Sequence, residues 1–273
     1  MATSRVRPTT GPAAPDADTP SRGPAIPSAH SPLIALVALL ACGLLATGAQ
    51  SGRPALAAAV LVVQLLLGLC WLAVLQASLA TAALVGLAAL ASDVLLLRNE
   101  RATAGSVAGV LGLAMVAAFA AQLMRRRRRD VTAGLAAAVS GVVLVTAASL
   151  ALPLRQFPSG REVALTGFVA VAVALVGARL LPGPAIPIRG LSLLVAIVVG
   201  ARYGATAGDL SAGAALAAAG TAAAFALVLD LGVVRMSRDV GQRQLPALKV
   251  VAALLPIVAA LPAVYIVGWI VAG

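Results

Sequence analysis

The chain has 273 residues, of which 61% are hydrophobic and only 11% are charged. Soluble domains are typically about 45–50% apolar and about 25% charged, so this composition excludes a water-soluble globular fold. The formal net charge of +11 does not indicate nucleic-acid binding, because the arginines stand at the ends of apolar segments.

Residues 1–31 precede the first apolar segment and are rich in Pro, Ser, Thr, Gly and Ala. A segment with so little to bury cannot offset the entropy lost on ordering, so we expect a disordered cytoplasmic tail. The transmembrane domain would then occupy 32–273. The alternative interpretation of the start is a signal peptide with a cleavage site near Thr47-Gly48-Ala49.

A membrane-spanning helix needs about 20 apolar residues, within a range of about 17–25. By this measure the sequence predicts an all-α fold, a polytopic membrane helix bundle of nine transmembrane helices, with eight as the alternative count. The predicted spans are 32–49, 55–75, 79–97, 105–124, 131–153, 163–181, 191–208, 212–233 and 250–272.

Two boundaries between these spans are less explicit than the others. Only Gln76-Ala77-Ser78 separates 55–75 from 79–97, but a single helix over both would be about 64 Å long, twice the roughly 30 Å hydrocarbon core. We therefore predict a tight turn there. The weakest boundary lies near Asp209, where a re-entrant or broken helix stays open as an alternative.

The orientation follows from the positions of Lys and Arg, which accumulate in cytoplasmic loops. Most of them fall on the inner side if the N-terminus is cytoplasmic, including the block Arg125-Arg126-Arg127-Arg128-Arg129. This block is expected to contact anionic lipid head groups. The alanine- and arginine-rich composition is typical of GC-rich bacteria, so the expected location is the bacterial inner membrane, as a multi-pass protein of the cell membrane.

Polar residues within the predicted spans are candidates for function, because polarity is costly in hydrocarbon. Gln64 stands near the centre of its span, where it would hydrogen-bond another helix or line a substrate path. Asp93 and Arg202 lie at similar depth near the outer side and would either pair or reach the surface separately. Asp230 and Arg179 lie near the cytoplasmic boundary, as interfacial residues or, for Asp230, as a proton or cation site.

Two further patterns concern the shape of the helices. Glycines four residues apart share a helix face and allow close packing; they occur at Gly200, Gly204 and Gly208, and at Gly105 and Gly109. Pro256 and Pro262 are expected to kink the last span, which would suit a gating or binding role or a purely structural one.

The sequence predicts no catalytic residue, no metal ligand and no cofactor. It has no Walker loop, HExxH, CxxC or GxSxG motif, and its one histidine, His30, lies in the tail. Three hypotheses follow: a transporter-like or lipid-handling protein for a hydrophobic or amphipathic substrate; a non-catalytic scaffold or accessory subunit; and, more remotely, a lipid-modifying enzyme. Expected partners are membrane lipids and either a membrane-protein partner or a second copy of the chain, but no nucleic acid.

Overall fold

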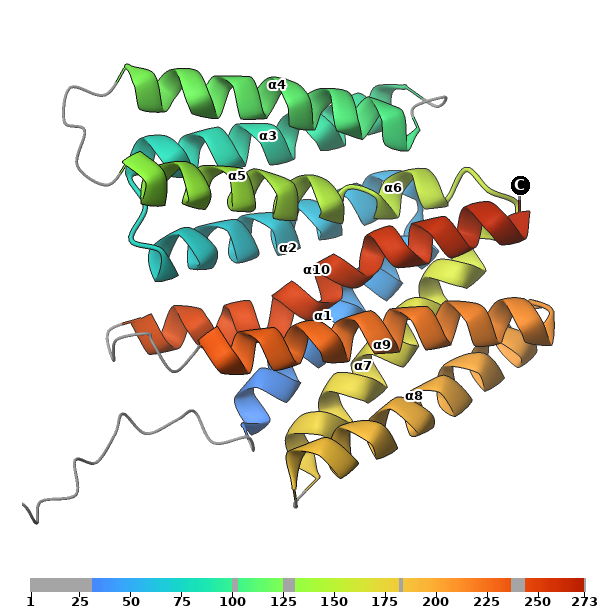
Figure 1. The fold of residues 1–273 in the computed structure, drawn as a ribbon. Coiled ribbons are helices and arrows are strands. Elements are labelled where there is room, and N and C mark those ends of the chain that lie inside the picture. Colours follow the sequence, from blue (N-terminus) through green and yellow to red (C-terminus); the bar gives the residue numbers. More distant parts are fainter. Residues whose placement is uncertain (1–30, 100–102, 125–130, 182–183, 237–243, 273) are drawn as a thin grey trace, which may run out of the picture.

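The computed structural model describes residues 31–99, 103–124, 131–181, 184–236 and 244–272. Within these ranges nine spans are long and apolar enough to cross a membrane, so the predicted nine-helix membrane bundle is confirmed and the chain is a multi-pass membrane protein (Figure 1). The helices are α1 (Pro32–Ser51), α2 (Arg53–Val74), α3 (Leu79–Arg98), α4 (Ala104–Leu123), α5 (Val131–Ala148), α6 (Ala151–Leu154), α7 (Gly160–Leu180), α8 (Ala185–Ala207), α9 (Ala212–Met236) and α10 (Leu245–Ala272).

The tight turn predicted between 55–75 and 79–97 is present. α2 ends at Val74, and Gln76 adopts a positive φ of 51°, which turns the chain out of the helical direction. Ser78 then caps α3 by accepting a hydrogen bond from the backbone N–H of Thr81.

The boundary near Asp209 is also a short turn, because Asp209 has a φ of 50° and full-length helices precede and follow it. The re-entrant alternative is therefore wrong.

The span predicted at 131–153 is interrupted near its end, although the prediction was of one continuous helix. α5 stops at Ala148, and the short helix α6 follows after Ser149 and Leu150. The physical reason is Pro153, which has no backbone N–H and whose ring crowds the carbonyl four residues earlier, that of Ser149. The break places Ser149 in the interior of the bundle, where it is fully buried.

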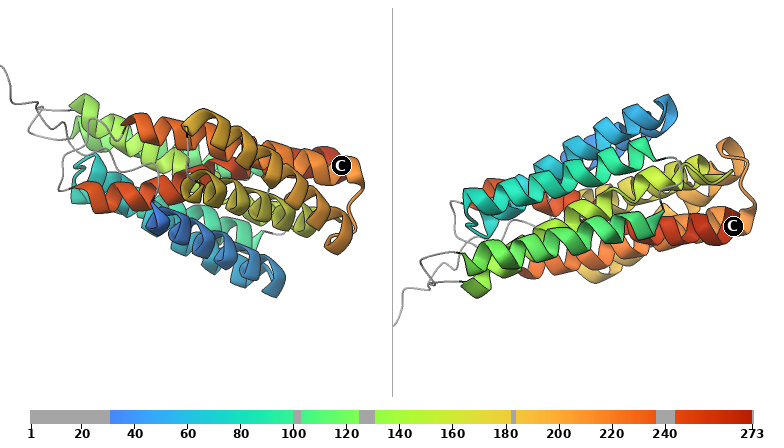
Figure 2. Two further views of the ribbon diagram at one scale, coloured as in Figure 1. Left: turned by 90° about the horizontal axis from the view of Figure 1, so that it is seen from below. Right: turned by 90° about the horizontal axis from the view of Figure 1, so that it is seen from above.

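The long helices run side by side from one end of the bundle to the other (Figure 2). α2, α3, α4 and α5 form one side of the molecule, and α7, α8 and α9 form the other. α10 lies between the two sides and contacts helices of both, and α1 contacts α2, α7 and α10. This central position explains why α10 has the largest buried share of all the spans.

α10 continues as one helix through Pro256 and Pro262, so the two prolines do not interrupt it, and the kink expected there stays a prediction. Most of its residues are buried against neighbouring helices, and packing of this kind tolerates proline within a membrane helix. Two prolines in the sequence therefore do not make this helix discontinuous.

The helix ends alternate between the two ends of the bundle (Figure 1). We call the end at which α4 finishes and α5 begins the predicted inner end, since the arginine block joins these two helices. The block itself and the N-terminal tail fall outside the described residues. Residues near the outer end include Tyr265, whose ring lies 5.8 Å from that of Phe157, and the exposed Trp269.

The two glycine patterns have different surroundings. A Cβ at Gly200 would lie 2.8 Å from that of Ala219 and 2.9 Å from that of Ala170, so α8 approaches both α7 and α9 closely here. Gly204 and Gly208 are similarly crowded. Gly109, by contrast, has open space around it, and a Cβ at Gly105 would meet only Thr103 of its own segment. Gly105 and Gly109 therefore do not pack against another helix of the described chain, and packing against a partner or a second copy stays a prediction.

Candidate functional site

A buried polar cluster joins α2, α3 and α5 between the middle of the bundle and its predicted outer end. It consists of Gln64 on α2, Ser92 and Asp93 on α3, and Ser149 at the α5–α6 break. Gln64, Ser92 and Ser149 have no exposed surface and Asp93 is 3% exposed. Four polar side chains thus share one apolar interior, which is costly unless they satisfy one another or a ligand.

The Gln64 amide organises this cluster. Its Nε2 lies 2.8 Å from the Val145 carbonyl oxygen and 2.8 Å from Ser149 Oγ, with Asp93 Oδ1 at 3.3 Å. A carbonyl oxygen can only accept a hydrogen bond, so the amide nitrogen must face Val145 and this fixes the orientation of the side chain. Gln64 therefore links α2 to both neighbouring helices.

The serines complete the connection between α3 and α5. Ser149 Oγ donates a hydrogen bond to Asp93 Oδ1 at 2.9 Å, and the hydroxyls of Ser149 and Ser92 are 2.7 Å apart. The α5–α6 break is what places Ser149 here, because the interrupted helix leaves this residue at the junction facing α3. Asp93 Oδ1 therefore accepts hydrogen bonds from Gln64 on α2 and from Ser149 at the α5–α6 junction.

Two oxygen atoms of the cluster have no partner. Asp93 Oδ2 and Gln64 Oε1 are buried and accept no hydrogen bond from any described residue. Each unpaired buried acceptor costs about 1–3 kcal/mol, and more if it is charged. Both atoms are acceptors, so the group that would complete the cluster chemically is a hydrogen-bond donor.

Gln64 also lines a pocket between α2 and α3. The pocket runs along both helices and is otherwise apolar, with Leu72, Val85 and Gly86 among its walls. Its cavity volume is about 30 Å³, and its total empty volume is about 250 Å³ including the open side. Leu65 and Leu69 also line it, and both are exposed on the side of the bundle that would face lipid. Gln64 therefore borders both the polar cluster and a pocket whose edge is exposed.

Asp93 and Arg202 are not brought together. α3 and α8 lie on opposite sides of the bundle (Figure 1), and no ion pair joins the two residues in the described chain. Arg202 is exposed, as separate solvation of its guanidinium requires, whereas Asp93 is buried with Gln64 and Ser149. The pairing hypothesis is wrong, and so is the expectation that Asp93 reaches the surface.

A second charged cluster lies near the predicted inner end, between α7, α8 and α9. Arg179 donates to Asp230 Oδ1, and Arg189 donates to Asp230 Oδ2 from Nη2 at 2.9 Å and from Nε at 3.3 Å. Asp230 has no exposed surface and Arg179 is 3% exposed. These residues are thus members of a buried ion-pair cluster, which is a different environment from the interfacial one that we expected.

Sequence reasoning missed Ser92, Ser149 and Arg189. Serine is common in membrane helices, so its presence alone does not indicate a functional site. Pro153, however, indicates the helix interruption that places Ser149 against its neighbours in the bundle. Arg189 falls between the predicted spans 163–181 and 191–208, whereas it lies in the first turns of α8. In the described ranges no group of three His, Cys, Asp or Glu side chains could hold a metal ion.

No protein-family model matches the chain, and neither a curated protein nor a solved structure shows a significant match to it. The geometry of the polar clusters is therefore the basis for any functional assignment.

Proposed function

We propose that this protein is a transporter-like or lipid-handling membrane protein, which binds a hydrophobic or amphipathic substrate at the cluster of Gln64, Asp93 and Ser149. One observation carries the proposal: Gln64 belongs to a buried polar cluster with unpaired acceptors and also lines a pocket that opens toward lipid. On its composition we place the protein in the inner membrane of a bacterium.

The unpaired atoms indicate which substrates would fit. Asp93 Oδ2 and Gln64 Oε1 both need a donor, and an amine or hydroxyl group supplies one. An ammonium group would in addition compensate the carboxylate, because the described surroundings of Asp93 hold no cation. We therefore favour an amphipathic molecule with an alkyl chain in the apolar pocket and an amine or hydroxyl at the cluster.

The test is photoaffinity labelling of the full-length protein in liposomes with a diazirine-bearing long-chain alkylamine. Labelling of α2 and α3 should fall about tenfold in Asp93→Asn, since hydrogen bonds to charged groups contribute about 1.5–3 kcal/mol. A diazirine alkane without the amine should label wild type and Asp93→Asn equally. Equal labelling of both proteins by the alkylamine contradicts the proposal.

The pocket provides a second, independent variant. A Cβ at Gly86 would meet nothing within 4 Å, so Gly86→Leu fills space in the pocket without a clash at the first atom. It should reduce alkylamine labelling and leave the cluster intact. Gly109→Leu on α4 is the matched control, because this glycine is equally open but does not line the pocket. If both leucine variants behave alike, entry through this pocket is disproved.

The second candidate function is a non-catalytic scaffold or accessory subunit. The observation that favours it is the poor coverage of α4 and α8, whose spans are each only 17% buried within the chain. A partner protein or a second copy would cover these helices. Co-purification of a stoichiometric partner, lost when Arg125–Arg129 are neutralised, would support this function, whereas a monomeric protein that passes the labelling test would exclude it.

A further inference from the structure

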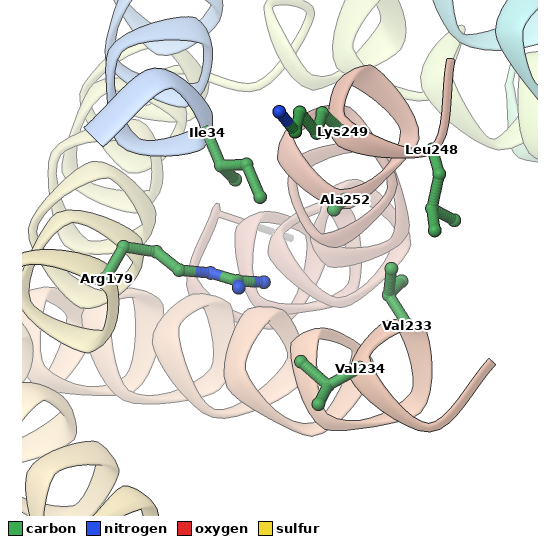
Figure 3. Close-up of a pocket in the computed structure, with 7 residues that line it drawn as sticks. All are labelled: Ile34, Arg179, Val233, Val234, Leu248, Lys249 and Ala252. Atoms are coloured by element: carbon green, nitrogen blue, oxygen red, sulfur yellow. The ribbon is translucent and has the colours of Figure 1, made fainter. Parts of the chain in front are cut away.

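A separate pocket lies at the predicted inner end, where α1, α7, α9 and α10 converge (Figure 3). Two cations contribute to its lining: Arg179 extends from α7 toward α10, and Lys249 stands on the first turns of α10 near Ile34. The remaining walls are apolar, with Val233, Leu248 and Ala252 among them. A pocket with a cationic interior and apolar walls suits an amphipathic anion.

The charges around this pocket are not balanced within the described chain. Both carboxylate oxygens of Asp230 are already engaged, one by Arg179 and the other by Arg189. Lys249 forms no ion pair with a described residue. Arg179 and Arg189 thus share the single carboxylate of Asp230, and Lys249 adds a third cation to the pocket, so these described side chains carry an excess of two positive charges. Uncompensated charge at this depth is costly unless a counter-ion binds.

Arg179 offers a specific donor for such a counter-ion. Its side chain is 4% exposed, and its Nε–H is buried without a hydrogen-bond partner among the described residues. Figure 3 shows the guanidinium projecting into the pocket. The cavity volume is about 20 Å³, within a total empty volume of about 290 Å³ that includes the open side. One oxygen atom therefore fits beside the guanidinium, while the rest of the ligand stays at the opening.

We propose that this pocket binds the phosphate group of an anionic phospholipid. Arg179 Nε donates to one phosphate oxygen, and the Lys249 ammonium compensates the remaining charge. Arginine suits this role because its planar fork can hold Asp230 and a phosphate at the same time. The pocket lies beside the first turns of α1 and α10, which is the depth of lipid head groups, and the apolar walls contact the glycerol and upper acyl region.

This site is independent of the proposed substrate site. It lies near the predicted inner end and draws on α7, α9 and α10, whereas the cluster of Gln64 and Asp93 lies toward the outer end between α2, α3 and α5. The lipid would be a bound structural or regulatory ligand of the protein, and either site can exist without the other.

The experiment uses the full chain in liposomes and a phosphatidylglycerol that carries a photoactivatable group in its head group. Cross-linked peptides are mapped, and those covering 245–252 are quantified. Lys249→Ala should lower this signal about fivefold, as expected for one cation near a lipid surface. Arg179→Lys keeps a cation for Asp230 but lacks the guanidinium Nε–H that donates to the phosphate, so it should also lower the signal. Arg98→Ala, which removes an exposed cation at the opposite end, is the control.

Three outcomes decide the proposal. Cross-linking that is lost in Lys249→Ala and Arg179→Lys, but retained in Arg98→Ala, supports it. Competition by millimolar inorganic phosphate would support the phosphate site and identify free phosphate as a second source of the ligand. Equal cross-linking by a matched phosphatidylcholine probe, or an unchanged signal in both pocket variants, overturns it.

Discussion

Asp230 and Asp93 are both buried carboxylates, but their surroundings differ. Asp230 has an arginine on each carboxylate oxygen, whereas Asp93 has hydroxyl and amide donors on one oxygen and none on the other. A carboxylate between two cations stabilises the packing of three helices, while one with an unpaired acceptor is suited to a ligand. Residue type alone does not distinguish these two roles.

Asp230→Asn should destabilise the protein by about 3–5 kcal/mol, because it leaves Arg179 and Arg189 as buried cations without a counter-charge. Thermal or denaturant unfolding of the purified protein in detergent micelles measures the effect. Asp209→Asn is the matched control, since Asp209 is exposed in a turn and asparagine tolerates its positive φ. Equal stability of the two variants would disprove the structural role of the ion-pair cluster.

The Gln64–Ser149 hydrogen bond should appear as energetic coupling. A double-mutant cycle of Gln64→Leu and Ser149→Ala is expected to give a coupling free energy of about 1 kcal/mol, the range found for hydrogen bonds between membrane helices.

The cycle of Asp93→Asn with Arg202→Gln should be additive within about 0.5 kcal/mol, since these residues are on α3 and α8, which lie on opposite sides of the bundle. Coupling in the second cycle and not in the first would contradict the structure.

Helices with similar composition have different environments in this protein. α8 places Gly200 and Gly204 against α7 and α9, while α4 directs Gly109 into open space. The glycine spacing is the same in both cases, so the difference comes from which neighbour the chain places beside each helix. Proline shows the same dependence on surroundings, because the span of α5 is interrupted four residues before Pro153, whereas α10 continues through Pro256 and Pro262.

Gly200→Ala should destabilise the bundle by about 1–3 kcal/mol, since its Cβ would meet the Cβ atoms of Ala219 and Ala170, which cannot rotate away. Gly109→Ala should be neutral or stabilising by up to about 1 kcal/mol through helix propensity. Unfolding of both variants in the same detergent compares them directly. A larger loss in Gly109→Ala would show that α4 packs against a partner.

The whole molecule consists of two groups of helices on either side of α10. α2 to α5 hold the polar cluster with Asp93, and α7 to α9 hold the ion-pair cluster with Asp230. Asp93 lies near the end of α3, at the predicted outer end, and Arg179 and Asp230 lie near the ends of α7 and α9, at the predicted inner end. The orientation bears on the proposed phospholipid pocket, because anionic lipid is concentrated in the cytoplasmic leaflet.

Thiol labelling in intact cells tests the orientation. In a background with Cys42 and Cys70 replaced by alanine, Ser159→Cys before α7 should react with a membrane-impermeant maleimide added outside. Ala77→Cys, in the turn between α2 and α3, should react only after the cells are permeabilised. The reverse pattern would place the arginine block outside and overturn the predicted topology.

The sequence by itself determined the fold class, the helix count and most boundaries. These properties depend on local quantities, namely the length of each apolar segment and the residues that end it, as the turn at Gln76 to Ser78 shows. Gln64, Asp93, Arg179 and Asp230 were recognised as unusual for the same reason, since a polar residue within a long apolar segment can be found from the sequence.

Only the tertiary structure decided which of these residues are partners. The sequence suggested that Asp93 and Arg202 could pair, because they lie at a similar depth in the membrane. Two residues at the same depth are neighbours only if their helices are adjacent in the bundle, and the sequence does not give that arrangement. The structure instead places Asp93 with Gln64 and Ser149, and Asp230 with two arginines. Lateral helix packing in a membrane depends on side-chain complementarity between distant segments, which no local pattern in the sequence records.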